Sequence, residues 1–257
     1  MMRLAGKAGV VTGTSRGLGR EIVLAFAQEG ACVVALSRDA EAGERVVAEA
    51  NAGGGAALFE QGDVTCEADI IRAIERCQAE FGTLDVFVNN AGILGEGRLH
   101  ETTNEQWDRL VAVHLTGTFW GCKHAVTAMR AAGRPGAIVN IGSILSFTGD
   151  GYLAAYTAMK SGILGLTKAI AIDYAADGIR CNCVCPGDME TPMIDEYFAG
   201  TGDALAARNE METAYPGKRI ARPEEVAAAV VYLASDEASF VNGTSLVVDG
   251  GLLAKTY

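Results

Sequence analysis

The stretch TGTSRGLG, residues 12–19, follows a short apolar run and precedes an amphipathic helical pattern, and this order decides the fold. Its glycines allow a tight turn and a close approach of the backbone to a pyrophosphate. The free N–H groups and the positive dipole end of the following helix would bind that pyrophosphate. Glycine turns also connect strands to helices in many proteins, so the motif alone leaves an ordinary structural turn as an alternative.

Short apolar runs rich in β-branched residues alternate with longer helical patterns along the whole chain. This alternation is typical of βαβ units around a parallel sheet. We therefore predict a single-domain, Rossmann-like, doubly wound α/β fold over residues 1–257, with a seven-stranded parallel sheet flanked by helices on both faces. The expected strands are Gly9–Thr12, Cys32–Leu36, Ala56–Gln61, Val86–Asn89, Ala137–Ile141, Arg180–Val184 and Ser245–Val248.

Helices are expected where capping side chains precede an apolar period of 3.6 residues. Thr65 is the expected cap of one helix, and Thr103 or Asn104 of a long one. Residues 188–216 form a candidate lid, because Met193–Tyr215 has no strand pattern and is typical of one or two short helices. The expected helices begin near Gly17, Ala40, Thr65, Asn104, Gly151 and Pro223.

Composition narrows the class of protein. The formal net charge of -11, with no run of basic residues, argues against a nucleic-acid partner. No apolar stretch is long enough to cross a bilayer, so we expect a soluble, cytoplasmic protein without a membrane partner. Cys181, Cys183 and Cys185 alternate along a strand without a zinc spacing, so we interpret them as buried apolar side chains and expect no metal site.

Tyr156 and Lys160 are four residues apart in a helical stretch, which places their side chains on one face, one turn apart. A free phenol has a pKa of about 10, and a neighbouring ammonium lowers it. Ser143 follows the fifth expected strand, and strand ends in this fold open onto the cofactor crevice. The three side chains form a candidate catalytic group, although a chance pair on a surface helix would give the same spacing.

Residues 12–19 resemble the Thr-Gly-x-x-x-Gly-x-Gly motif of the classical short-chain dehydrogenase/reductase family. Further motifs agree in order: Asp63, Asn89-Asn90-Ala91-Gly92, Ser143 with Tyr156-x-x-x-Lys160, Pro186-Gly187, and the closing Val248-Asp249-Gly250-Gly251. The resemblance covers nearly the whole chain. It implies a short-chain alcohol dehydrogenase or ketoreductase that transfers a hydride between a nicotinamide and a carbonyl or secondary alcohol. It also implies a homotetramer.

The resemblance implies a role for each catalytic side chain. Tyr156 would give or take the hydroxyl proton, Ser143 would bond the substrate oxygen, and Lys160 would lower the pKa of the tyrosine and hold the nicotinamide ribose. The resemblance and the glycine loop together imply these cofactor-binding residues: Gly13, Ser15, Arg16, Gly17, Leu18, Gly19, Ser37, Arg38, Asp63, Val64, Asn90, Ala91, Gly92, Tyr156, Lys160, Pro186, Gly187 and Thr191.

The end of the second expected strand favours NADP(H) over NAD(H). An acidic residue there would bond the ribose 2′-hydroxyl of NAD, whereas this chain has Ser37 and Arg38. Arg38 can fork onto a 2′-phosphate, and Arg16 can approach it from the glycine loop. The alternative is a solvated Arg38, with Asp39 next to the ribose of NAD.

His114 stands where many family members carry an asparagine that holds a water behind the catalytic lysine. A neutral imidazole also donates and accepts, so we expect a proton relay with a titration near pH 6 to 7. A packed histidine without a catalytic part, or a site tuned away from ordinary turnover, would be alternatives.

The expected substrate pocket is mostly apolar with a few polar edges. It suits a cyclic or medium-chain alcohol or ketone, a steroid, a sugar or a 3-oxoacyl thioester. Asp188 and Glu190 indicate either a pocket that faces hydroxyls or solvated lid charges. A non-catalytic dinucleotide-binding protein, an NAD-preferring dehydrogenase and an epimerase or dehydratase of the same fold remain alternatives. The substrate residues expected are Ser143, Leu145, Tyr152, Tyr156, Asp188, Met189 and Met193, with Ile93, Leu94, Gly149–Gly151 and Tyr197 nearby.

Overall fold

A seven-stranded parallel sheet of order β3-β2-β1-β4-β5-β6-β7 forms the centre of the computed structural model, which describes residues 2–256. All six neighbouring pairs are parallel, which confirms the predicted doubly wound fold. The strands are β1 (Ala8–Thr12), β2 (Cys32–Ser37), β3 (Ala56–Gln61), β4 (Val86–Asn89), β5 (Gly136–Ile141), β6 (Ile179–Pro186) and β7 (Ser245–Val248).

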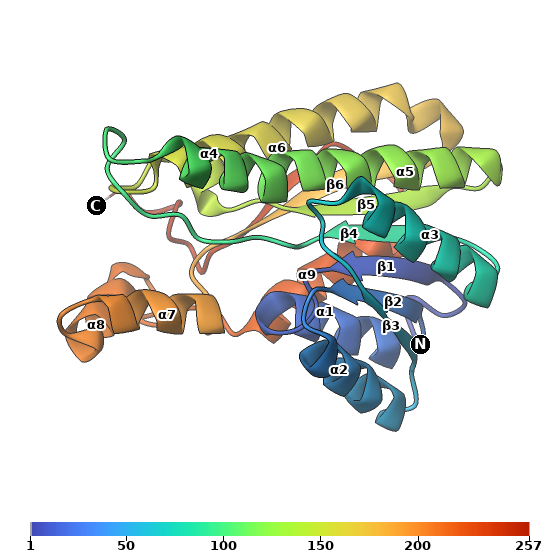
Figure 1. Cartoon of the computed structure of the whole chain (residues 1–257), viewed down its shortest axis with the longest axis horizontal. Helices are drawn as coiled ribbons and strands as arrows, with labels where there is room; N and C mark the ends of the chain where they lie inside the picture. Colours follow the sequence, from blue (N-terminus) through green and yellow to red (C-terminus); the bar gives the residue numbers. More distant parts are fainter. Residues whose placement is uncertain (1, 257) are drawn as a thin grey trace.

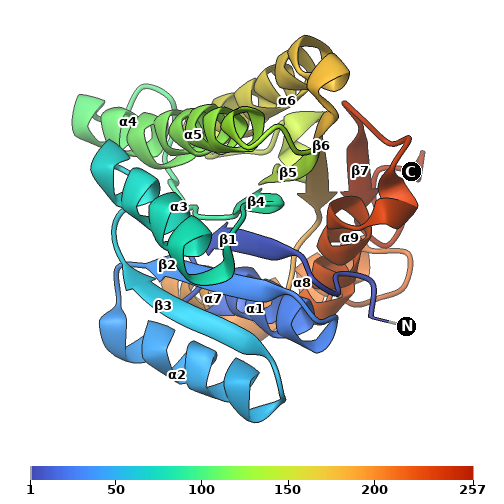
Figure 2. The ribbon, with the colours of Figure 1, turned by 90° about the vertical axis from the view of Figure 1, so that its right-hand side faces the viewer.

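Helices cover both faces of the sheet. Figure 1 shows α3 to α6 on one side and α1, α2 and α9 on the other, while α7 and α8 project beyond the layers. The turned view in Figure 2 shows the same two layers on either side of the twisted sheet. The helices are α1 (Gly17–Gln28), α2 (Ala40–Ala52), α3 (Glu67–Phe81), α4 (Asn104–Leu110), α5 (Gly117–Ala131), α6 (Ala154–Asp173), α7 (Pro192–Gly200), α8 (Ala204–Ala214) and α9 (Pro223–Ala234).

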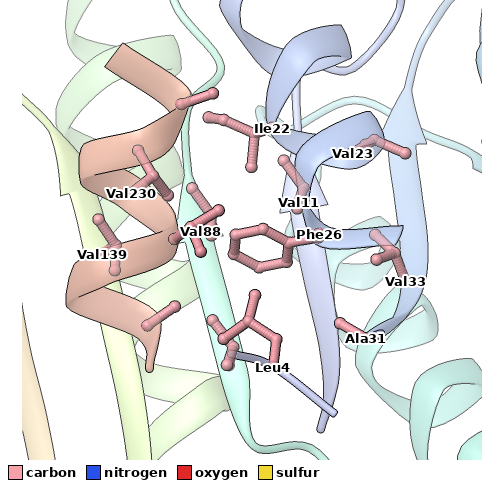
Figure 3. Close-up of a cluster of buried hydrophobic side chains, with 14 of the residues drawn as sticks. Leu4, Val11, Ile22, Val23, Phe26, Ala31, Val33, Val88, Val139 and Val230 are labelled. Atoms are coloured by element: carbon pink, nitrogen blue, oxygen red, sulfur yellow. The ribbon is translucent and has the colours of Figure 1, made fainter. Parts of the chain in front are cut away.

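The core is divided by the sheet, because successive side chains of a strand point to opposite faces. Val11 and Val33 belong to the cluster beneath α1 and α9, whereas Val10 and Val34 belong to the cluster beneath α3 and α5. Phe26 lies at the centre of the first cluster, between α1, α9 and the strands (Figure 3). Strands buried on both faces explain the continuous apolar runs of the sequence.

Two helix starts differ in detail from the prediction. Thr103 caps α4 with a full capping box to Gln106, as expected. Helix α3 instead begins after Cys66, without a side-chain cap, and Thr65 bonds Asp63, so the expectation that Thr65 caps this helix is wrong. The Thr65 hydroxyl donates to the Asp63 carboxylate instead, because both side chains lie in the turn between β3 and α3.

The long helix expected from Asn104 is interrupted by a π-helical turn, Val111–Thr116, between α4 and α5. Such turns insert one residue into a helix and are frequent at functional sites. This turn carries His114, which is 1% exposed. Within residues 2–256, the helices are all too short or too polar to cross a bilayer.

Candidate active site

The glycine loop joins β1 to α1 at the carboxyl edge of the sheet. Gly13 and Gly17 have φ values of +70° and +57°, which L side chains rarely adopt. A Cβ on Gly19 would overlap the carbonyl of Gly13. The loop therefore needs glycine at these positions, and its backbone is exposed for close contact with a phosphate.

Asn90, directly after β4, supports this loop from the neighbouring strand. Its Nδ2 donates to the carbonyls of Thr12 and Gly13 at 2.9 and 3.1 Å. The hydroxyl of Thr12 accepts from the backbone N–H groups of Asn90 and Ala91, each at 3.0 Å. The order of strands reverses between β1 and β4, so this bridge lies at the topological switch point where dinucleotides bind.

A cavity of about 1060 Å³ opens at this edge. Its lining contains every residue that the sequence analysis assigned to the cofactor, from the glycine loop to Tyr156, Lys160 and Thr191. His114 also lines it. Thr191 reaches the glycine loop from the start of α7, since a Cβ on Gly17 would lie 3.4 Å from its methyl group.

The end of the cavity beside β2 carries exposed guanidinium groups and a buried hydroxyl. Arg38 is largely exposed and lies 3.8 Å from the Asp63 carboxylate, and Arg16 pairs with Glu196 of α7 at 2.7 Å. The hydroxyl of Ser37 is buried without a hydrogen-bond partner within residues 2–256. Exposed guanidinium groups beside an unpaired hydroxyl provide the donors that a 2′-phosphate requires.

Arg45 also lines the cavity, and the sequence analysis missed it. The spacing in the sequence could have indicated it, because Asp39, Ala42 and Arg45 are three residues apart. In the structure all three line the cavity. Such spacing places residues on one face of a helix. In the structure Arg45 pairs with Glu41 at 2.5 Å.

Lys160 lies in the wall of the cavity with a side chain that is almost fully buried. Its ammonium donates to the carbonyl of Ile141 at 2.9 Å and lies 5.5 Å from the centroid of the Tyr156 ring. Burial lowers the pKa of Lys160 from 10.5 to about 8. The lysine is thus a cation held at the end of β5 beside Tyr156.

Burial raises the pKa of the Tyr156 phenol well above 10, and the Asp188 carboxylate raises it further, while the Ser143 side chain lowers it. The phenol is therefore protonated in the cofactor-free protein. Ser143 follows β5, where its Oγ accepts from the backbone N–H of Leu145 at 3.1 Å. The structure thus brings Ser143, Tyr156 and Lys160 together from the end of β5 and from α6.

The imidazole of His114 packs edge-on against Tyr156, with ring centroids 5.4 Å apart. Its Nε2 lies 2.8 Å from the carbonyl oxygen and 3.2 Å from the backbone nitrogen of Ile93, whereas Nδ1 is buried without a partner in the described residues. Burial and the charge of Lys160 lower the pKa of His114 to about 3. The expected titration near pH 6 to 7 is therefore wrong, because a charged imidazole would stand in an apolar wall beside an ammonium.

The expected substrate residues divide between three places. Met189 and Met193 line the large cavity, and Tyr152 lines a smaller cavity of about 200 Å³ shared with Ile93 and Leu94. Ser143, Leu145 and Asp188 line neither cavity.

Comparisons with known proteins agree with this geometry. A family model described as enoyl-(acyl carrier protein) reductase matches residues 13–253. The cis-4-hydroxycyclohexanecarboxylate dehydrogenase of Sinomonas cyclohexanicum is 43% identical, over 97% of this chain and 98% of its own length. The chain belongs to the short-chain dehydrogenase/reductase family.

Other members of this family support the same placement. The 3beta-hydroxysteroid dehydrogenase 1 of Eggerthella lenta is 40% identical, over 97% of this chain and 94% of its own length. A solved short-chain dehydrogenase/reductase of Burkholderia xenovorans superposes with a TM-score of 0.95 at 35% identity and covers 100% of both chains. The protein is a short-chain alcohol dehydrogenase.

The buried lysine of this dehydrogenase predicts a pH-dependent stability. Below about pH 8 Lys160 is charged in both the folded and the unfolded state, so the cost of its burial is fully present. Between about pH 8 and 10.5 only the unfolded state keeps the proton, so the folded state gains stability as the pH rises. Relative to Lys160→Met, the cofactor-free wild type should gain up to about 3 kcal/mol over this range, measured by urea unfolding. A difference that is constant with pH would contradict the buried charge.

Proposed function

We propose that this enzyme is an NADP(H)-dependent oxidoreductase that interconverts a cyclic secondary alcohol and its ketone. The observation that carries the proposal is the Tyr156 phenol, placed between Lys160 and His114 on the wall of a cavity large enough for a dinucleotide. Steroids, sugars, medium-chain alcohols and 3-oxoacyl thioesters complete the panel to be tested. The relatives named for a hydroxycyclohexane carboxylate and a hydroxysteroid support the cyclic substrate.

The side chains divide the chemistry of the reacting oxygen between them. The nicotinamide, when bound, supplies or accepts the hydride. The Ser143 hydroxyl bonds the carbonyl oxygen, and the protonated Tyr156 phenol donates a proton to it during reduction. The Lys160 ammonium stabilises the phenolate that remains, because an opposite charge at short range favours the charged form.

The guanidinium groups at the adenosine end support the preference for NADP(H). Arg38 lies 3.8 Å from the half-buried carboxylate of Asp63 and Arg16 pairs with the exposed carboxylate of Glu196, so a 2′-phosphate with its larger negative charge can compete for both. Glu196 would then lose its partner on the glycine loop. An NAD-preferring dehydrogenase is the outcome expected if Arg38 stays in solvent.

The first test is the oxidation of NADPH and of NADH with the substrate panel, followed through the absorbance of the reduced nicotinamide. Wild type should oxidise NADPH with a cyclic ketone, and Tyr156→Phe should lose at least about 100-fold in kcat, because the proton donor is missing. Arg38→Leu should lose about 10- to 100-fold in kcat/KM for NADPH and little for NADH, because a hydrogen bond to a charged group is removed.

The matched control is Arg130→Leu, an exposed arginine of α5 paired with Asp177 far from the cavity lining. It should leave both cofactors unaffected. Preference of wild type for NADH would refute the cofactor assignment. Binding of both cofactors without oxidation of either would favour the non-catalytic dinucleotide-binding protein.

His114 we assign to the proton relay as a neutral positioning residue. Its Nε2–H donates to the Ile93 carbonyl, which leaves Nδ1 as a bare acceptor in the cavity wall. The Nδ1 atom of His114, next to the Tyr156 and Lys160 pair, can accept a hydrogen bond from a hydroxyl or a water of the relay while the imidazole stays neutral.

His114→Asn tests this role, because an amide can keep both contacts to Ile93 but loses the ring against Tyr156. The smaller side chain admits water and weakens the burial that raises the pKa of Tyr156. The alkaline rise of kcat for alcohol oxidation should therefore move to lower pH, with kcat reduced about 10-fold. A pH profile identical to that of wild type would exclude His114 from the relay.

A homotetramer explains the apolar side chains left in solvent. Phe119 of α5 and Ile172 of α6 are exposed on one layer, and Phe240 lies exposed near the C-terminal segment. Two such surfaces on one protomer suit an assembly with two kinds of symmetric contact. Light scattering should give four times the protomer mass of 26.8 kDa, and Phe119→Glu with Ile172→Glu should give a smaller species. A monomeric wild type would contradict the assignment.

A further inference from the structure

Asp188 follows the Pro186-Gly187 turn, and hydrogen bonds with the Tyr215 hydroxyl hold its carboxylate in place. The Tyr215 hydroxyl accepts from the backbone N–H of Asp188 at 2.6 Å and donates to its Oδ2 at 2.8 Å. Tyr215 is 3% exposed, and a Cβ on Gly187 would lie 2.6 Å from its oxygen. The closed pair of hydrogen bonds leaves the carboxylate a single orientation.

The backbone around Asp188 is also held independently of the projecting helices α7 and α8. The N–H of Gly187 donates to Val248 at the end of β7 at 3.1 Å. The carbonyl of Asp188 accepts from Ala221 at 2.9 Å, and Glu190 donates back to Ala221 at 2.9 Å. Asp188 therefore stands on a fixed element, as a group that sets specificity must.

The carboxylate shares its surroundings with the catalytic phenol. Its charge raises the pKa of Tyr156, and the pKa of Asp188 itself is raised by burial and by the charge of Asp150. Asp188 itself lines neither cavity, but its chain neighbours Gly187 and Met189 both line the large one. Oδ1 of Asp188 has no hydrogen-bond donor within residues 2–256, so a half-buried carboxylate keeps acceptor capacity that the protein does not use.

We propose that Asp188 determines specificity by accepting a hydrogen bond from a second donor group of the substrate, a hydroxyl or an ammonium, and by repelling substrates with an anionic substituent. The inference rests on the proposed function of the Tyr156 site. A half-buried carboxylate with one protein donor gains a second bond from such a substrate, whereas an anion beside it would add a like charge.

Two arginines, Arg98 and Arg109, lie on this side of the site. The guanidinium of Arg98 lies 5.6 Å from the centroid of the Tyr152 ring. Arg109 lines both cavities, and Glu96 shares the smaller one with it, so an anion held there would also meet a carboxylate. With the Asp188 carboxylate in addition, we expect a neutral polyhydroxylated or an amino-substituted alcohol to be preferred.

The test compares kcat/KM for cyclohexanol, cyclohexane-1,4-diol, 4-aminocyclohexanol and 4-hydroxycyclohexanecarboxylate, with NADP+ as oxidant. Wild type should prefer the diol or the amino alcohol to cyclohexanol by about 10-fold in kcat/KM. A larger gain with the diol would identify a hydroxyl as the donor to Asp188, and a larger gain with the amino alcohol would identify an ammonium. In Asp188→Asn the amide oxygen keeps Tyr215, so the amide N–H₂ faces the substrate. This preference should then disappear, and the carboxylate substrate should gain about 10-fold.

Two further variants separate charge from orientation. Tyr215→Phe keeps the charge of Asp188 but releases the carboxylate, so it should lose preference for the diol and still disfavour the anionic substrate. Glu190→Gln is the matched control, because Glu190 is exposed and paired with Arg208 at 3.1 Å, and it should keep the wild-type ratios. The midpoint of thermal unfolding of each variant, compared with that of wild type, verifies that it is folded.

An unchanged ratio in Asp188→Asn, or a wild type that favours 4-hydroxycyclohexanecarboxylate over cyclohexanol, would overturn the inference and leave the proposed function standing. Absence of turnover with every alcohol in wild type would contradict the proposed function, and the inference with it.

Discussion

The buried ammonium of Lys160 is the constraint on which the active site depends. A cation in an apolar wall is unfavourable unless it is hydrogen-bonded, and here its bond goes to the Ile141 carbonyl at the end of β5. The lysine, being on α6, can reach that carbonyl only while the helix lies along this edge of the sheet. The same placement brings Tyr156, one turn earlier on the helix, over the cavity. Charge, helix and strand end are thus coupled, and in the mechanism we propose the destabilising lysine is retained because it stabilises the Tyr156 phenolate.

The parallel sheet supplies the rest of the arrangement. The carboxyl ends of β1, β4, β5 and β6 carry the glycine loop, Asn90, Ser143 and the Gly187 turn, so residues far apart in sequence meet at one edge. Backbone contacts between these ends, such as those from Asn90 to the glycine loop, fix their relative positions. Binding and catalytic groups therefore stand on strand ends, which are more rigid than free loops. The stretch with α7 and α8 projects beyond the layers around the sheet (Figure 1).

Much of the fold could be predicted from the sequence because its signals are local. Glycine spacing, apolar runs and the Tyr156-x-x-x-Lys160 period each depend on a few neighbouring residues, and they located the seven strands and much of the lining of the large cavity. Features that depend on tertiary packing were missed. The π-helical turn at His114 and the low pKa of its imidazole arise from burial beside Lys160, which no local pattern reports. Tyr215 was likewise invisible as a partner of Asp188, because a loop brings the two together.

Transfer of the hydride itself is the most direct measure of the account. The enzyme is supplied with a cyclic ketone and with NADPH that carries two deuterium atoms at C4 of its nicotinamide, so that either face delivers the label, and the alcohol is analysed by mass spectrometry. We expect one deuterium at the carbinol carbon for each cofactor oxidised. Product without deuterium, or conversion of substrate with no net oxidation of the cofactor, would contradict it and indicate an epimerase or dehydratase of the same fold.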